Sequence, residues 1–142
     1  MIIISESKPI IFEPRNDGYR LLADAQFFVS LFPDEMVRGK NSVLRPNGWL
    51  YIYKHFWWDG ASGAVDTKSN MRASLVHDVL INMVQAGLID NDENTKVKID
   101  SLYFRLARED GMGLIRSIIH LLAIQFNKWN RKLARVLKPK PQ

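Results

Sequence analysis

The sequence predicts an α+β fold in which an N-terminal antiparallel β-sheet of about four to five short strands packs against three C-terminal α-helices. Up to Trp58, short apolar segments alternate with turn residues, which is typical of strands. From Ser69 onward, apolar residues recur three and four positions apart, which is typical of amphipathic helices. With 142 residues, of which 46% are hydrophobic, we expect one domain over residues 1–142, β-rich over 1–58 and helical over 69–137.

Four segments of the first half have strand character. Residues 2–4 and 10–12 are short apolar runs, and Pro14 is expected to close the second. Residues 19–30 carry apolar side chains at alternate positions and suit one half-buried strand. Residues 49–53, Trp-Leu-Tyr-Ile-Tyr, are the clearest strand of the chain.

Turn residues separate these segments. Asn16-Asp17-Gly18 predicts a turn, and residues 38–41 predict a loop. Arg45-Pro46-Asn47-Gly48 is the best hairpin turn, because Asn-Gly tolerates positive φ.

Three helices are expected in the second half. The first begins at a cap formed by Ser69 or Asn70 and ends at Gly87, and the second runs from about Thr95 to Glu109. The third helix carries an apolar stripe made of Leu114, Ile118, Leu121, Leu122, Phe126, Trp129 and Leu133.

Composition excludes several classes of protein. The chain has no cysteine, so disulfides, zinc-cysteine sites and thiol catalysis are excluded within it. The start lacks the features of a signal peptide, and the longest apolar stretch is too short to span a bilayer. These observations predict a soluble, non-exported protein without a transmembrane segment.

The net charge of +5 is concentrated at the C-terminus. The basic tail, residues 128–142, contains no acid and carries Lys128, Arg131, Lys132, Arg135, Lys138 and Lys140, so the remaining residues sum to −1. Such a patch is suited to contact with a neighbouring protein subunit. It is also typical of a solvated helix end, where cations complement the helix dipole. Contact of the tail with nucleic acid or a membrane surface is the less favoured alternative.

A second set of residues could form a metal site or a catalytic site. His77 and Asp78 interrupt an apolar helical run, and burying either group requires a polar partner. Asp59, Ser62 and Asp100 are the candidate partners. Imidazole and carboxylates could form a metal site from His77, Asp78 and Asp100, with Asp59 as a further ligand. An acid/base pair with Ser62 as nucleophile is a second interpretation. The favoured interpretation is a buried structural network that ties the turn to the helices.

Aromatic residues gather on the clearest strand. Trp49, Tyr51 and Tyr53 share one face, whereas Leu50 and Ile52 share the other. If the aliphatic face is core, the aromatic face is exposed and suited to binding a partner. If it is not, the aromatic residues pack beneath the helices. Stacking on single-stranded nucleic acid is disfavoured, because few basic residues lie among these aromatics.

Four short motifs follow one another along the chain in an order that is typical of one protein family. They are Tyr19-Arg20-Leu21-Leu22, residues 56–62 (Phe-Trp-Trp-Asp-Gly-Ala-Ser), residues 74–80 (Ser-Leu-Val-His-Asp-Val-Leu) and residues 99–103 (Ile-Asp-Ser-Leu-Tyr). This order resembles domain-of-unknown-function family 1353, whose members are small proteins of tailed bacteriophages and prophages. Two departures concern Trp58, where such turns usually have Thr, and residues 63–65, where they tend to continue Ile/Val-Pro-Arg. The resemblance implies a phage setting and no particular reaction.

Two hypotheses of function follow. The first is a virion- or tail-associated structural or assembly protein that binds other phage proteins or itself, located in the virion or the host cytoplasm and forming a homo- or hetero-oligomer. Its contact residues would be Trp49, Tyr51, Tyr53, Trp129, Arg131, Lys132 and Arg135. The second is a small metal-dependent hydrolase built on the His-Asp residues. The first needs no cofactor, and the sequence leaves open whether the chain is an enzyme.

Overall fold

A computed structural model describes residues 10–60 and 70–137 of the chain, with side chains described up to residue 125. The predicted α+β class is confirmed: short antiparallel strands precede three helices. The described strands number seven and form two sheets, where the sequence predicted about four to five strands in one.

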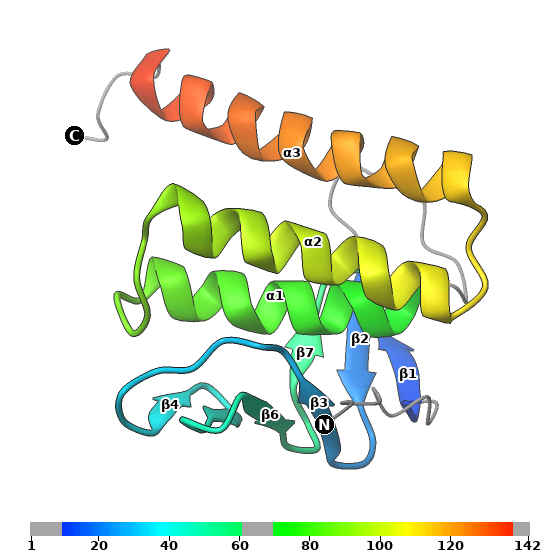
Figure 1. Ribbon diagram of the computed structural model, residues 1–142. Coiled ribbons are helices and arrows are strands. Elements are labelled where there is room, and N and C mark those ends of the chain that lie inside the picture. Colours follow the sequence, from blue (N-terminus) through cyan, green and yellow to red (C-terminus); the bar gives the residue numbers. More distant parts are fainter. Residues whose placement is uncertain (1–9, 61–69, 138–142) are drawn as a thin grey trace.

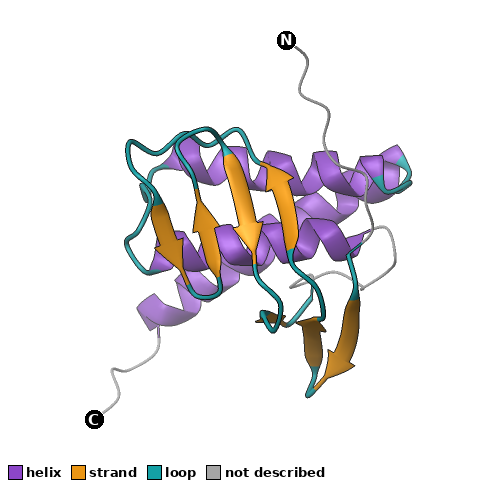
Figure 2. Cartoon of the chain, turned by 90° about the horizontal axis from the view of Figure 1, so that it is seen from below, coloured by secondary structure: helices purple, strands orange, loops and turns teal. Residues whose placement is uncertain are grey.

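The first sheet has three strands in the order β1–β2–β7 and the second has four in the order β3–β6–β5–β4. The strands are β1 (Phe12–Arg15), β2 (Gly18–Leu21), β3 (Ala25–Phe28), β4 (Val37–Gly39), β5 (Ser42–Leu44), β6 (Trp49–Ile52) and β7 (Trp57–Trp58). Figure 2 shows both sheets in front of the helices, with the four-stranded sheet forming one broad face.

The helices are α1 (Met71–Gln85), α2 (Glu93–Glu109) and α3 (Leu114–Leu137). They stack outward from the sheets in chain order: α1 and α2 lie next to each other, and α3 lies beyond them on the side farthest from the sheets (Figure 1). This order leaves one long side of α3 at the surface of the described part of the molecule.

Two expected segments differ from the structure. Residues 19–30 do not form one strand: β2 and β3 belong to different sheets, and the chain turns at Asp24, whose Oδ1 accepts a hydrogen bond from the backbone N–H of Lys54 at 2.8 Å. Residues 38–41 are not wholly loop, because β4 extends to Gly39. The expected strand at residues 2–4 lies outside the described residues.

Turn chemistry was easier to predict. Asn16 and Asp17 both have positive φ, 48° and 63°, which is the two-residue hairpin geometry that joins β1 to β2. Gly48, with φ of 87°, ends the predicted turn between β5 and β6 and donates its N–H to the carbonyl of Arg45. Pro14 lies within β1 rather than after it, which an edge strand tolerates.

Trp58 joins the small sheet to the helices. Its side chain is fully buried, with the rings of Phe12 and Tyr19 at centroid distances of 6.0 and 5.6 Å. Its indole N–H donates to Ser74 Oγ on α1 at 3.0 Å, so the buried polar atom is satisfied. This contact fixes the position of the chain just before Asp59 and Gly60.

Helix α2 starts two residues earlier than expected, after Asp92. The Asp92 Oδ1 atom accepts a hydrogen bond from the backbone N–H of Thr95 at 2.7 Å, which caps the helix. That bond lowers the pKa of Asp92 below its usual value. Helix α1 follows Asn70, whose side chain makes no cap bond.

Candidate functional site

His77 and Asp100 form a buried pair between α1 and α2. The distance from His77 Nε2 to Asp100 Oδ1 is 2.8 Å, and the side chains are 16% and 7% exposed. The rings of His77 and Tyr103 also form a T-shaped contact, with centroids 5.8 Å apart and planes at 82°. The pair joins residues 23 positions apart and holds the two helices together at mid-length, as the favoured interpretation expects of these two residues.

Of the other proposed members, Asp59 does not extend this pair. Asp59 is exposed, so it is not part of a buried network and that prediction is wrong. Asp78 is half-buried on α1, and Ser62 lies outside the described residues. Over residues 10–60 and 70–125, no group of three His, Cys, Asp or Glu side chains is placed to hold a metal ion.

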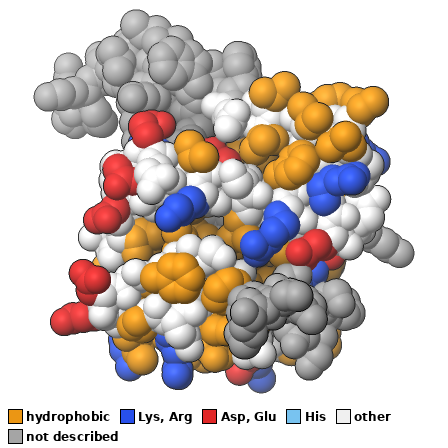
Figure 3. Space-filling model, viewed as in Figure 1, with side chains coloured by type: hydrophobic (Ala, Val, Ile, Leu, Met, Phe, Trp, Pro, Cys, Tyr) orange, Lys and Arg blue, Asp and Glu red, His pale blue; other side chains and the backbone are white. Residues whose placement is uncertain are grey.

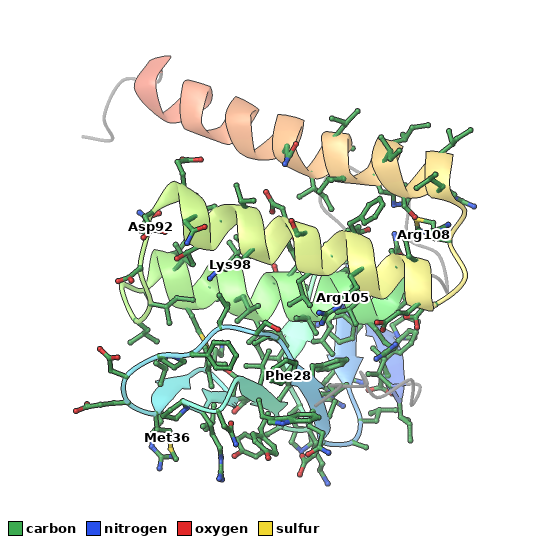
Figure 4. All side chains as sticks on the ribbon, viewed as in Figure 1. Phe28, Met36, Asp92, Lys98, Arg105 and Arg108 are labelled. Atoms are coloured by element: carbon green, nitrogen blue, oxygen red, sulfur yellow. The ribbon has the colours of Figure 1, made fainter. Side chains whose placement is uncertain are left out.

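One recess of the described structure lies away from the pair. A recess of about 750 Å³ opens between residues 31–38 and the segment joining α1 to α2, and it is lined by neither His77 nor Asp100. Asp92 and Lys98 contribute to its walls from the α2 side (Figure 4). In the described residues we find no observation that favours the hydrolase hypothesis.

A second pair between α1 and α2 was missed by the sequence analysis. Arg72 Nη1 donates to Asp110 Oδ1 at 2.6 Å, and the side chains are 5% and 16% exposed. The Arg72 guanidinium also lies over the Phe27 ring, 5.4 Å from the ring centroid, which is within reach of a cation–π contact. Burial raises the pKa of Asp110, and the hydrogen bond from Arg72 opposes this rise. In the sequence, this pair is indicated only by an arginine within the apolar run 71–76, which needs a polar partner if it is buried.

A third polar cluster attaches α3 to the other helices. His120 Nδ1 lies 3.3 Å from the Tyr103 hydroxyl on α2 and 3.4 Å from Asn70 Nδ2 before α1. Both groups can donate to a neutral ring. Burial, and then the charge of Arg116, lower the pKa of His120, which favours that neutral form. In the sequence, this cluster is indicated by the histidine that interrupts the apolar stretch of the third helix.

The aromatic strand face is the outer face of the four-stranded sheet. Leu50 and Ile52 are fully buried, whereas Trp49 and Tyr51 are half-buried and Tyr53 is exposed. The aliphatic face of this strand is therefore core and the aromatic face points outward, whereas binding of a partner by Trp49, Tyr51 and Tyr53 stays a prediction.

Neighbouring side chains cover part of this aromatic face. Phe28 packs on Trp49 with ring centroids 5.8 Å apart, and the Arg45 guanidinium lies 5.0 Å from the centre of the Tyr51 ring. Arg105 reaches from α2 to the backbone carbonyl of Phe28, to which it donates at 3.0 Å (Figure 4). These contacts cover Trp49 and Tyr51 in part, and Tyr53 remains exposed.

In the described first half of α3, most of the apolar residues face away from the core. The residues that face inward are Ser117, His120 and Ile124, which are all buried. The exposed residues, with their exposed fractions, are Leu114 (52%), Ile115 (75%), Ile118 (43%), Ile119 (58%) and Leu122 (58%). Figure 3 shows hydrophobic side chains gathered where the N-terminal half of α3 lies. Leu114, Ile118 and Leu122, which belong to the predicted stripe, therefore do not pack on the core.

For the predicted contact residues in the basic tail, the structure describes the backbone alone. Trp129, Arg131, Lys132 and Arg135 lie on the helical backbone of α3, and their side chains are outside the described set. Their role in binding stays a prediction.

Comparisons with known proteins found no matching family model, no similar curated protein and no similar solved structure. The resemblance to domain-of-unknown-function family 1353 therefore stays a prediction from the motifs. Among the described residues, no helix combines the length and apolar character needed to cross a membrane.

Proposed function

We propose that this chain is a structural or assembly protein that acts by binding another protein chain through the outer face of α3. The observation that carries the proposal is the exposed apolar row Ile115, Ile118, Ile119 and Leu122, on the side of α3 opposite its buried residues. Contiguous exposed apolar patches of this kind mark interaction sites in folded proteins.

The design of the helix supports this proposal. Burying each large aliphatic side chain is worth about 1.5–3 kcal/mol, yet here the inward side of α3 holds Ser117 and His120 while isoleucines and a leucine stay exposed. A helix whose only task was to close the core would place its largest aliphatic residues inward. The arrangement is explained if the outer face is buried in a complex.

The phage setting is a further part of the proposal. It is supported by the Trp-Trp-Asp-Gly-Ala-Ser turn, the His-Asp helix and the Ile-Asp-Ser-Leu-Tyr segment, which resemble small phage and prophage proteins. A virion- or tail-associated subunit in the virion or the host cytoplasm would have other phage proteins, or its own copies, as partners.

Photo-crosslinking tests the binding function directly. A benzophenone amino acid is placed at position 119 of the full chain, in the cells that produce it, and the matched control carries it at Val97 on α2, which is 56% exposed. We expect a discrete protein adduct from position 119 and none from position 97. Equal labelling from both positions, or no protein adduct from 119, would contradict the proposal.

A further inference from the structure

The outer face of the four-stranded sheet gathers aromatic and basic side chains from several strands. Along the chain, few cations lie among the aromatic residues of β6, but the pairing of the strands brings others to them. Arg38 of β4 lies opposite Val43 of β5, which in turn lies opposite Tyr51 of β6. Arg45 follows Val43 by two residues and shares its face, and its guanidinium lies 5.0 Å from the centre of the Tyr51 ring. The fold therefore places two arginines beside the rings.

Several rings on this side of the sheet remain accessible. Tyr53 is 42% exposed and Phe32 is 62% exposed. The Phe28 ring lies between Phe32 and Trp49, at centroid distances of 6.1 and 5.8 Å. Trp49 and Tyr51 are alternate residues of β6, so their backbone positions are about 6.6 Å apart along one side of the strand. In Figure 2, no element of the described residues lies in front of this sheet.

Charge at this face has one sign. Residues 36–58, which include β4, β5, β6 and β7, contain no acid and four cations: Arg38, Lys40, Arg45 and Lys54. The residues of β3 are uncharged. Four other arginines of the described residues each pair with a carboxylate, whereas the exposed side chains of Arg38 and Arg45 form no ion pair with another described residue. Such cations attract a polyanion.

We propose that this face binds single-stranded nucleic acid, with bases stacked on its rings and phosphates on Arg38 and Arg45. Bases stack on aromatic rings and on guanidinium planes, and an unpaired strand leaves the faces of its bases free to do so. A duplex keeps those faces stacked between neighbouring base pairs. The inference goes beyond the proposed function and does not depend on it, because α3 lies on the side of the molecule farthest from the sheets (Figure 1).

The charge pattern favours a polyanion over a protein segment as the occupant. Exposed aromatic residues alone would suit a protein partner. Here they stand beside cations that no acid of residues 36–58 balances, which suits a chain of phosphates. Asp24, Asp34 and Glu35 lie in the segments that lead into β3 and β4. Repulsion from these acids at the flanks would keep a bound strand on the sheet.

Fluorescence anisotropy of the full chain tests this proposal with labelled oligo(dT), oligo(U) and a duplex, each of about 16 nucleotides, an ordinary upper site size. Tyr53→Ala should weaken single-strand binding roughly five- to hundredfold, the usual effect of losing one stacked base, and should leave duplex binding unchanged. Trp57→Ala is the matched control, because Trp57 is 46% exposed but belongs to the small sheet. It should bind both single strands as the unmodified chain does.

Salt dependence tests the two arginines separately from the rings. Arg38→Gln and Arg45→Gln should each reduce the slope of log affinity against log salt by about 0.7, the value of one phosphate contact with a single strand. Lys98→Gln, which removes an exposed cation on α2, should leave this slope unchanged. Circular dichroism of each variant should match that of the unmodified chain, since the substituted side chains are exposed.

Three results would overturn the proposal. The first is the absence of saturable binding of either single strand. The second is binding that Tyr53→Ala and Arg45→Gln leave intact and that Lys132→Gln with Arg135→Gln abolishes, because the basic tail would then be the binding segment. The third is sedimentation with phosphatidylglycerol vesicles that Tyr53→Ala abolishes while single-strand binding is unchanged, because the face would then bind lipid.

Discussion

The pair His77–Asp100 should behave as one coupled unit in folding. His77→Ala removes the 2.8 Å contact and leaves the Asp100 carboxylate, only 7% exposed, without this partner. Leaving a buried polar group unsatisfied costs about 1–3 kcal/mol. Asp100→Ala should cost a similar amount, because it removes the partner of the imidazole, which is 16% exposed.

The double variant should lose less than the sum of the two single losses. Once one partner is gone, removing the other leaves no further group unpaired, so we expect a coupling free energy of about 1–2 kcal/mol, within the range of about 0.5–3 kcal/mol seen for contacting residues. Urea unfolding measures it, since a loss of about 2 kcal/mol moves the midpoint by about 1 M at an ordinary slope.

An exposed pair serves as the control for this cycle. Lys96 and Glu93 lie 3.8 Å apart on α2, with Glu93 largely in solvent, and their coupling should be at most about 0.5 kcal/mol. If His77 and Asp100 show additive losses, or couple no more strongly than this control, they do not link α1 to α2 as argued.

Three further predictions follow from other contacts. Arg72→Met should lower the free energy of unfolding by about 3–5 kcal/mol, because it leaves the Asp110 carboxylate without its ion-pair partner. Calorimetry measures this loss, and adding Asp110→Leu should recover much of it. Gly18→Ala should destabilise by about 1–3 kcal/mol, because an added Cβ would clash with the Trp57 ring and with the backbone carbonyl of Trp58. A neutral result in chemical unfolding would refute the close contact. The lowered pKa of His120 predicts that the free energy of unfolding is highest above about pH 6.5, the usual histidine pKa. This stability should be lost as the pH falls toward the folded-state pKa, because the unfolded chain binds the proton first. His120→Asn should flatten that part of the profile of unfolding free energy against pH.

Local chemistry explains what the sequence predicted well. Asn16-Asp17-Gly18 and Pro46-Asn47-Gly48 form the expected turns because their residue types suit the required backbone angles. The helices follow from three- and four-residue spacing, and the partnership of His77 with Asp100 was foreseeable because a buried imidazole needs a polar partner.

The remaining features depend on contacts between distant residues. Residues 19–30 alternate as one strand would, yet Asp24 binds the backbone of Lys54 and directs the chain into a second sheet. The exclusion of Asp59 from the buried network depends on where Trp58 anchors the chain through Ser74. The pairing of Arg72 with Asp110 joins residues 38 positions apart, which spacing alone does not indicate.

The direction of α3 is the clearest such case. The apolar spacing suggests a core-facing side, but in the described first half of the helix Tyr103 and Asn70 contact His120, which lies on the opposite, inward-facing side. Spacing identifies the stripe, whereas the surrounding elements determine which way it points.

Crosslinking combined with a charged substitution tests the central claim, that the outer face of α3 binds another protein chain, most directly. The protein adduct formed from position 119 of the full chain should be lost with Leu122→Asp and kept with Val97→Asp, with unchanged circular dichroism in both variants. An adduct that Leu122→Asp leaves intact, or the absence of any protein adduct from position 119, would contradict it.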